Sequence, residues 1–125
     1  METSMGPKKG EGAWLWLAKI ASGALLILVL IVHMIVNHLV AEGGLLTYAD
    51  VVAYFSNPWV VAMEIFFLVF VVSHALMGLR SVLLDLNPAR GFLKAVNALF
   101  VVVGIGAVIY GVWLALEIAS RSAGA

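Results

Sequence analysis

Cysteine is absent from the 125 residues of the chain. By itself the chain therefore forms no disulfide, no zinc site built on thiolates and no cysteine-held iron–sulfur cluster. Charge is scarce as well: charged residues make up 11% of the sequence, and seven lysines and arginines balance seven aspartates and glutamates. A net charge of zero argues against nucleic acid as a partner, because a nucleic-acid-binding protein is expected to carry a basic patch.

Long polar segments are also missing. The polar parts are confined to residues 1–13, a loop over 41–57 and a turn over 87–91. None of them approaches the roughly 50 residues of a small domain, so none can fold as a catalytic domain. Any soluble chemistry linked to this chain is expected to belong to a partner protein.

Apolar residues dominate instead, at 64% of the sequence, which leaves too little polar surface to cover a soluble core. Apolar runs over 14–40, 58–86 and 93–118 each exceed the roughly 20 residues that a helix needs to cross about 30 Å of hydrocarbon. At these lengths only a helix satisfies its own backbone in lipid. The sequence predicts an all-α protein with three transmembrane helices over these runs, in a single domain over residues 1–125.

The charges beside the runs predict their orientation. Lys8 and Lys9 precede the first run, and Arg90 and Lys94 lie near the turn between the second and third. By the positive-inside rule, we expect the N-terminus in the cytoplasm and the C-terminus outside. Within the first loop, residues 47–56 include apolar and aromatic side chains, which predict a short helix on the outer interface.

The third run has small residues, Gly104, Ala107 and Gly111, at spacings of three and four. They fall on one helical face, where another helix can approach closely. This run carries no histidine and no central charge. We interpret it as a packing helix.

Two histidines lie within the first two runs, where an ionisable group needs a partner or a function. The helical rise places His33 roughly 10 Å to the outer side of the first midpoint and His74 roughly 3 Å to the cytoplasmic side of the second. Their separation in depth is thus about 13 Å, whereas two histidines on one iron have nitrogens only about 4 Å apart. They cannot share one haem. As axial ligands they would serve two haems, each completed by another chain, so this chain would form half of a haem-binding helical bundle.

The residues alone leave a simpler interpretation open, in which both histidines are packing groups hydrogen-bonded to a neighbouring helix. His38 lies about 140° round the helix from His33 and near the outer interface, and we interpret it as an interfacial or propionate-side histidine. Glu64 lies inside the outer end of the second run, where an interfacial or interhelical hydrogen-bonding role is favoured over a proton carrier.

Other polar residues follow the two histidines along the helices. Gly78, four residues beyond His74, leaves room for a flat macrocycle, and Asp85 lies on the same face roughly 16 Å nearer the cytoplasm. Arg80 lies on another face, from which it could reach a haem propionate or anchor at the interface. The face of His33 also carries, at helical spacing, Lys19, Ser22, Leu26, Val29 and Asn37.

Two motifs resemble a known family. The stretch HALMGLRSVLLD over 74–85, with a glycine four and an aspartate eleven residues after the histidine, resembles the haem-ligating helix of the membrane-anchor subunits of succinate dehydrogenase, or complex II. The stretch HMIVNH over 33–38 is similar to the first-helix segment of the anchors that carry two haems. In some relatives arginine stands at the position of Lys19, and a quinone-contacting tyrosine at that of Leu86.

The resemblance implies a membrane-anchor domain that binds haem b and passes electrons to membrane quinone. Arg80 would be a partner of a propionate or of the quinone, and the number of haems, one or two, stays open. The residues that the resemblance singles out are His74 and His33 as axial ligands of the proximal and distal haem, Gly78, Arg80 and His38 near the haems, and Asp85, Ser22 and Lys19 near the quinone.

The expected partners are a second membrane-anchor subunit, an iron–sulfur subunit and a flavoprotein subunit, and FAD and the clusters would be held only in these partners. The chain alone is not expected to be an enzyme, and its place is the cytoplasmic membrane of a bacterium or archaeon. Three questions stay open. They are the direction of the reaction (succinate oxidation or fumarate reduction), the choice of ubiquinone or menaquinone, and the oligomeric state. A trimer of the whole complex is one candidate for that state. The alternative from another class is a haem-free transmembrane scaffold or assembly subunit.

Overall fold

A computed structural model gives the fold of the chain and describes residues 6–40, 43 and 47–124. Part of the predicted loop over 41–57 therefore lies outside the described residues. The helices follow one another in the order α1 (Ala13–Ile35), η1 (Val36–Val40), α2 (Tyr48–Tyr54), α3 (Pro58–Asp85) and α4 (Arg90–Ala123).

Three of these segments are long and apolar enough to cross a membrane, namely Ala13–Val40, Pro58–Asp85 and Arg90–Ala123. The described residues form helices and no strand, so the prediction of an all-α chain with three spanning helices is confirmed. The ends differ from the predicted runs. The first run finishes in the five-residue π-helix η1. Helix α4 extends past both ends of 93–118, because polar residues can continue a helix beyond the hydrocarbon.

Local capping explains where α2 and α3 begin. Thr47 accepts a hydrogen bond from the backbone N–H of Asp50, whose carboxylate accepts one from the backbone N–H of Thr47 in return, which is a capping box. Asn57 accepts from the backbone N–H of Trp59, and Pro58 occupies the first turn of α3, where its missing N–H costs nothing.

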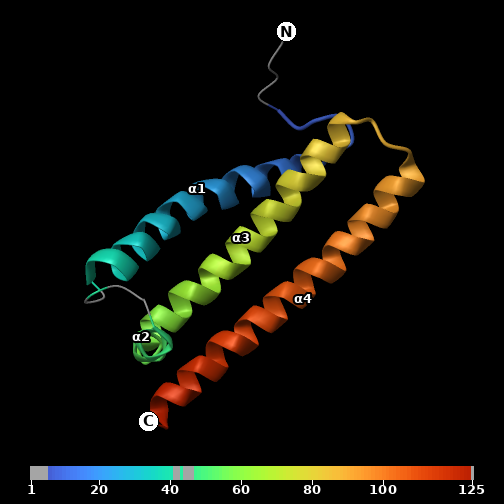
Figure 1. Cartoon of the computed structure of the whole chain (residues 1–125). Coiled ribbons are helices and arrows are strands. Elements are labelled where there is room, and N and C mark those ends of the chain that lie inside the picture. The colour runs from blue at the N-terminus through green and yellow to red at the C-terminus, as the bar shows by residue number, and fades with distance from the viewer. Residues whose placement is uncertain (1–5, 41–42, 44–46, 125) are drawn as a thin grey trace.

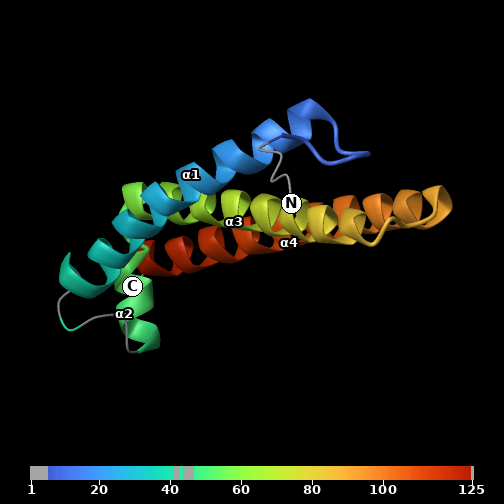
Figure 2. The same ribbon diagram turned by 90° about the horizontal axis from the view of Figure 1, so that it is seen from above.

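The three long helices lie side by side, with α3 in the middle. Figure 1 shows α3 running between α1 and α4 and antiparallel to both, and α3 contacts each of them. Seen from above, α1 is inclined to α3 rather than parallel to it (Figure 2). The short helix α2 packs against α4 near the C-terminus. We call this the α2 end of the bundle, and we call the opposite end, where α1 starts and α3 finishes, the N-terminal end.

The small residues of α4 face α3, as expected for a packing helix. A Cβ placed on Gly104 would lie 2.8 Å from Cδ1 of Leu76, and one placed on Gly111 would overlap the side chain of Leu68. A larger residue at either position would push the two helices apart or displace the leucine.

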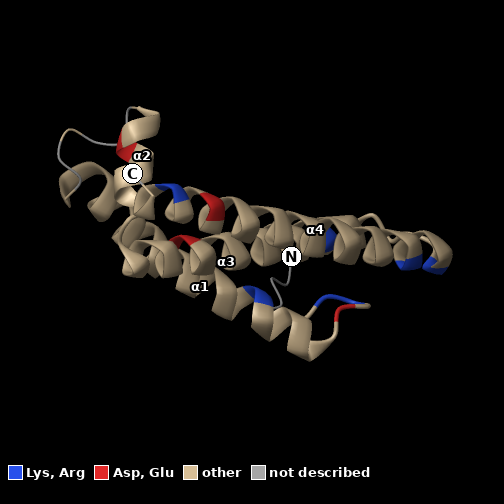
Figure 3. Ribbon diagram, turned by 90° about the horizontal axis from the view of Figure 1, so that it is seen from below, with Lys and Arg blue, Asp and Glu red and all other residues tan. Residues whose placement is uncertain are grey.

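The helices carry their apolar side chains mostly on the outside. Among the described residues, Val60 and Ala115 are the only hydrophobic residues that are buried, whereas many large ones along all three helices are exposed. Figure 3 shows long stretches of ribbon without a charged residue between the two ends of the bundle. Such a surface needs lipid or other helices around it.

Candidate functional site at the N-terminal end

His74 lies in the interface between α3 and α1. Its Nδ1 atom is 3.2 Å from the backbone carbonyl oxygen of Lys19 and 3.2 Å from Oγ of Ser22. The ring fits there because α1 has a glycine at the contact: a Cβ on Gly23 would lie 3.0 Å from Cε1 of His74. Ser22 is buried, and its hydroxyl also donates to the Lys19 carbonyl at 3.0 Å.

These contacts assign the tautomer of His74. A carbonyl oxygen can only accept, so the hydrogen of the neutral ring belongs on Nδ1 and the lone pair on Nε2. Nε2 has no hydrogen-bond partner among the described residues, and it is not an enclosed atom. Histidines that ligate a metal through Nε2 are held in this way, by a carbonyl or carboxylate on Nδ1. His74 therefore fits the role of an axial haem ligand.

The surroundings of His74 also leave space. A Cβ on Gly78 would meet nothing within 4 Å beyond its own chain neighbours and the backbone of its own helix. The described residues contain no group of three or more His, Cys, Asp or Glu side chains that could hold a metal ion. A haem iron does not need such a group, since one histidine on each side suffices.

A second polar group, formed by Glu11, Lys19 and Ser81, lies one to two turns nearer the N-terminal end. Lys19 Nζ donates to Oε1 of Glu11 at 2.8 Å and to Oγ of Ser81 at 3.0 Å. The Glu11 side chain is 3% exposed and that of Lys19 is 18% exposed, so the pair is well shielded. It links the segment before α1 to both α1 and α3.

Lys8 adds a more exposed pair beside this group. Its ammonium donates to Oδ2 of Asp85 at 2.6 Å and, at 3.4 Å, to the backbone carbonyl of Ser81. The side chains of Lys8 and Asp85 are 40% and 57% exposed. The backbone N–H of Lys8 donates to Oε2 of Glu11 at 3.2 Å, so both carboxylate oxygens of Glu11 accept hydrogen bonds.

The environment of Glu11 favours its charged form. Burial alone would raise the pKa of this carboxyl, but the hydrogen bonds from Lys19 and from the Lys8 backbone, together with the charges of Lys19 and Arg80, hold the pKa below its usual value. Glu11 is therefore an anion at neutral pH.

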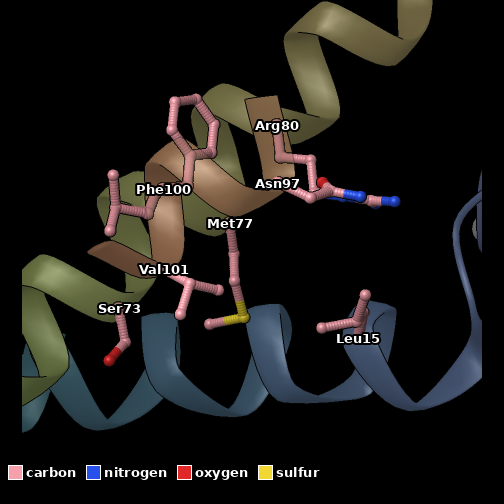
Figure 4. A pocket seen from close by; sticks show the side chains of 8 residues that line it. Leu15, Ser73, Met77, Arg80, Asn97, Phe100 and Val101 are labelled. Atoms are coloured by element: carbon pink, nitrogen blue, oxygen red, sulfur yellow. The ribbon is translucent and has the colours of Figure 1, made fainter. Parts of the chain in front are cut away.

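Arg80 points to a different part of the molecule, as its position on another helical face predicts. Its Nε donates to Oδ1 of Asn97 in α4 at 2.8 Å. Figure 4 shows the two side chains at one side of an apolar groove of about 330 Å³ between α3, α4 and the start of α1. The groove is lined by Leu15, Ser73, Leu76, Met77, Arg80, Asn97, Phe100 and Val101.

His33 lies toward the α2 end, in a separate hydrogen-bonded group. Its Nδ1 atom is 3.0 Å from Oε1 of Glu64, and its Nε2 atom is 2.9 Å from Nδ2 of Asn37. Tyr54 of α2 donates to the same Glu64 oxygen at 2.6 Å. The His33 ring stacks on Phe67, with 4.9 Å between ring centroids. The expected interhelical role of Glu64 fits these contacts.

The charge at Glu64 acts on Tyr54 and on the tautomer of His33. Burial and the neighbouring carboxylate raise the pKa of the Tyr54 hydroxyl, so it stays protonated and remains a donor. The carboxylate of Glu64 also places the hydrogen of His33 on Nδ1. Nε2 of His33 is then an acceptor, and the Asn37 amide occupies it. Asn37 is buried, and its own Oδ1 has no hydrogen-bond partner among the described residues.

The predicted residues therefore fall into three places. His74 and Ser22 meet directly, and Lys19 and Asp85 lie nearby in separate ion pairs with Glu11 and Lys8. Arg80 faces the groove beside α4, His33 belongs to the group near α2, and His38 is exposed on η1.

Sequence reasoning missed several members of these groups. Ser81 could have been found, because it lies seven residues after His74 and four before Asp85 on one helical face. Glu11 and Lys8 lie in the polar N-terminal segment, outside any periodic pattern. Tyr54 and Asn97 meet their partners only through tertiary contacts.

The chain is similar to known membrane anchors over most of its length. The family model of the succinate dehydrogenase/fumarate reductase transmembrane subunit matches residues 3–119. A succinate dehydrogenase hydrophobic membrane anchor subunit of Archaeoglobus fulgidus is 35% identical over 103 residues, which are 82% of this chain and 87% of the relative. The subunit of the same name from Thermoplasma acidophilum is 26% identical over 102 residues, or 82% of this chain and 83% of that relative.

No solved structure matches the chain. The family model covers far more than half of the residues, and the Archaeoglobus relative exceeds 30% identity over more than two thirds of the chain. The chain belongs to the transmembrane subunits of succinate dehydrogenase and fumarate reductase, and it is a membrane-anchor subunit of complex II.

Proposed function

We propose that this anchor binds haem b through Nε2 of His74 and shares the haem with a second anchor subunit. The observation that carries the proposal is the fixed tautomer of His74, with Nδ1 on the Lys19 carbonyl and Nε2 free. When bound, haem b takes up and releases single electrons between the partner subunits and membrane quinone. The chain's own residues orient the ring, and Gly78 leaves space beside it.

A second haem on His33 is part of the same proposal. Glu64 holds Nδ1 of His33 as the Lys19 carbonyl holds that of His74, which is the carboxylate arrangement common for ligating histidines. The Asn37 amide now bonded to Nε2 would have to turn away. His38, exposed on η1, would lie on the propionate side of this haem.

The quinone would bind at the N-terminal end. As an ammonium, Lys19 has three N–H groups, of which Glu11 and Ser81 take two, so one remains for a quinone carbonyl oxygen. Among the described residues Asp85 forms an ion pair with the exposed Lys8, a type of pair worth about 1 kcal/mol or less, so its carboxylate can be released to serve as a hydrogen-bonding group near the quinone. Ser22 supports the site through its bond to the His74 ring, and Arg80 is a donor for a propionate or the quinone.

The proposed setting follows from the family. The N-terminal end would face the cytoplasm and meet an iron–sulfur subunit, which a flavoprotein subunit supplies with electrons, in the cytoplasmic membrane of a bacterium or archaeon. This orientation agrees with the lysines and arginines near that end. A trimer of such complexes is one candidate assembly.

Optical spectra of the purified complex test the haem proposal. We expect a reduced haem b band, and His74→Ala should remove one haem while leaving the other largely in place. His33→Ala should remove the other, whereas His38→Ala, which removes a propionate-side group and no axial ligand, should leave both haems bound. No haem band at all would favour the haem-free scaffold. Loss of both haems in either variant would contradict one histidine per haem.

A further inference from the structure

We infer that Glu11 is a positioning residue for the quinone end of this anchor, because its buried carboxylate holds the Lys19 ammonium on the Ser81 hydroxyl. The inference rests on the proposed role of Lys19 in quinone binding. It assigns a function to the segment that precedes α1, which no pattern in the sequence connects with the helices.

The geometry around Lys19 carries the inference. Lys19 lies in the second turn of α1, and within the described residues its side chain makes one hydrogen bond to α3, the 3.0 Å contact with the Ser81 hydroxyl. A lysine has a long, flexible side chain, so one neutral hydrogen bond does not fix its ammonium. The 2.8 Å contact with Glu11 supplies a second, charge-assisted bond from another direction, and such bonds are about twice as strong as neutral ones.

Glu11 is itself fixed. Its side chain is 3% exposed, and its second oxygen accepts from the backbone N–H of Lys8, so the carboxylate cannot turn away without leaving that donor unpaired. The lowered pKa of Glu11 agrees with a carboxylate that stays charged.

The neighbouring charges explain why a carboxylate is needed at this place. Lys8 and Lys19 both reach Ser81, one at its backbone oxygen and the other at its hydroxyl. Two ammonium groups so close together repel each other, and this repulsion would move the more mobile side chain toward solvent. Asp85 neutralises Lys8 and Glu11 neutralises Lys19. Only the Glu11 pair is shielded from water, so only that pair can hold its lysine against screening.

The test replaces Glu11 by an isosteric neutral residue in the assembled complex. Glu11→Gln is compared with Glu117→Gln, the matched control, because Glu117 is a partly exposed carboxylate at the α2 end, paired with Arg121 at 3.2 Å. Lys19→Ala and the Glu11→Gln, Lys19→Ala double variant complete a double-mutant cycle. The subunit content of each preparation shows that the variants assemble.

Two readouts are measured. The first is the rate at which an amine-reactive acylating reagent modifies Lys19, followed by mass spectrometry with the exposed Lys94 as internal reference. We expect Glu11→Gln to raise this acylation rate severalfold, because the ammonium loses its charged partner, and Glu117→Gln to leave the rate unchanged.

The second readout is the KM for a soluble quinone. We expect it to rise about tenfold in Glu11→Gln with a smaller change in kcat, and to rise no further when Glu11→Gln is added to Lys19→Ala.

The outcomes separate the inference from the proposed function. Unchanged acylation of Lys19 in Glu11→Gln would overturn the inference whatever the KM. Two outcomes with faster acylation would also overturn it. In the first, the KM effect of Glu11→Gln adds fully to that of Lys19→Ala in the double variant. In the second, Glu11→Gln leaves the KM unchanged although Lys19→Ala raises it. Faster acylation without a KM effect in either single variant would support Glu11 as the residue that positions Lys19 and would contradict the proposed quinone role of Lys19.

Discussion

At the scale of single residues, the rings of His33 and His74 are oriented in the same way, through Nδ1, but by different acceptors. Both have Nδ1 on an acceptor of this chain, a backbone carbonyl for His74 and the Glu64 carboxylate for His33. The carbonyl belongs to the helix backbone and survives any side-chain substitution, whereas the carboxylate is itself held by Tyr54. The orientation of His74 therefore depends mainly on how closely α1 approaches α3.

That dependence gives a prediction for Gly23. In Gly23→Ala the new Cβ would lie 3.0 Å from Cε1 of His74 and 3.5 Å from Nδ1, so the ring must move by a few tenths of an ångström or α1 must draw back. Overpacking of this kind typically costs about 1–3 kcal/mol. We expect haem b content, measured from the reduced-minus-oxidised spectrum, to fall severalfold.

Gly91→Ala is the control for Gly23→Ala, since Gly91 is also helical and a Cβ there meets nothing within 4 Å. Its spectrum should equal that of the parent complex. An unchanged spectrum in Gly23→Ala would mean that the ring contact with α1 does not govern ligation.

At the scale of elements, α4 shows how one helix uses glycine in two ways. Gly104 and Gly111 face α3, where side chains of Leu76 and Leu68 occupy the space that a Cβ would take. Gly106 is on another part of the same helix, and a Cβ there would meet nothing within 4 Å. The sequence pattern of small residues identified the packing face, but the depth to which each leucine enters could not be read from spacing.

The two kinds of glycine should respond to alanine with opposite signs. In Gly104→Ala the new Cβ would lie 2.8 Å from Cδ1 of Leu76, so the leucine side chain must move aside. We expect this overpacking to destabilise the subunit by about 1–3 kcal/mol. Gly106→Ala is expected to be neutral or to stabilise it by up to about 1 kcal/mol, through the better helix propensity of alanine. Thermal midpoints of the detergent-solubilised complex measure the difference, and equal shifts for the two variants would argue against the α3–α4 contact.

At the scale of the whole molecule, the main feature is that few of the apolar side chains that the structure describes are buried. Exposed large side chains lie on all three long helices, for example Ile27, Phe66 and Ile109 at 64%, 60% and 64% exposure. In the proposed complex, lipid and a second anchor subunit would cover them. Figure 3 shows charged residues toward both ends of the bundle, so in the proposed complex the orientation in the membrane would decide which end meets the soluble subunits.

The predicted orientation can be tested with single cysteines, because the chain has none of its own. An impermeant thiol reagent applied to right-side-out vesicles should label Ser122→Cys, near the C-terminus, and should leave Lys9→Cys unlabelled until the vesicles are opened. Any label on this subunit reports the introduced residue, whatever cysteines the partners carry. Labelling of Lys9→Cys in closed vesicles would reverse the assignment.

The sequence by itself determined the class of protein and much of the fold. Length and hydropathy fix three spanning helices because lipid leaves the backbone no other way to satisfy its hydrogen bonds. Helical periodicity placed Lys19, Ser22, His33 and Asn37 on one face of the first spanning segment, which is α1 continued by η1, and they do meet α3 or one another there. Asp85 and Arg80 were likewise assigned to different faces of α3, and they have different partners.

Only the tertiary structure decided which side chains contact each other. The pairing of Glu11 with Lys19, the bond from Tyr54 to Glu64 and the fit of His74 against Gly23 join segments from different parts of the chain or from outside the helices. Periodicity gives the direction of a side chain from its own helix axis. It does not give the distance or tilt between two helices, and hydrogen bonds depend on differences of a few tenths of an ångström in both.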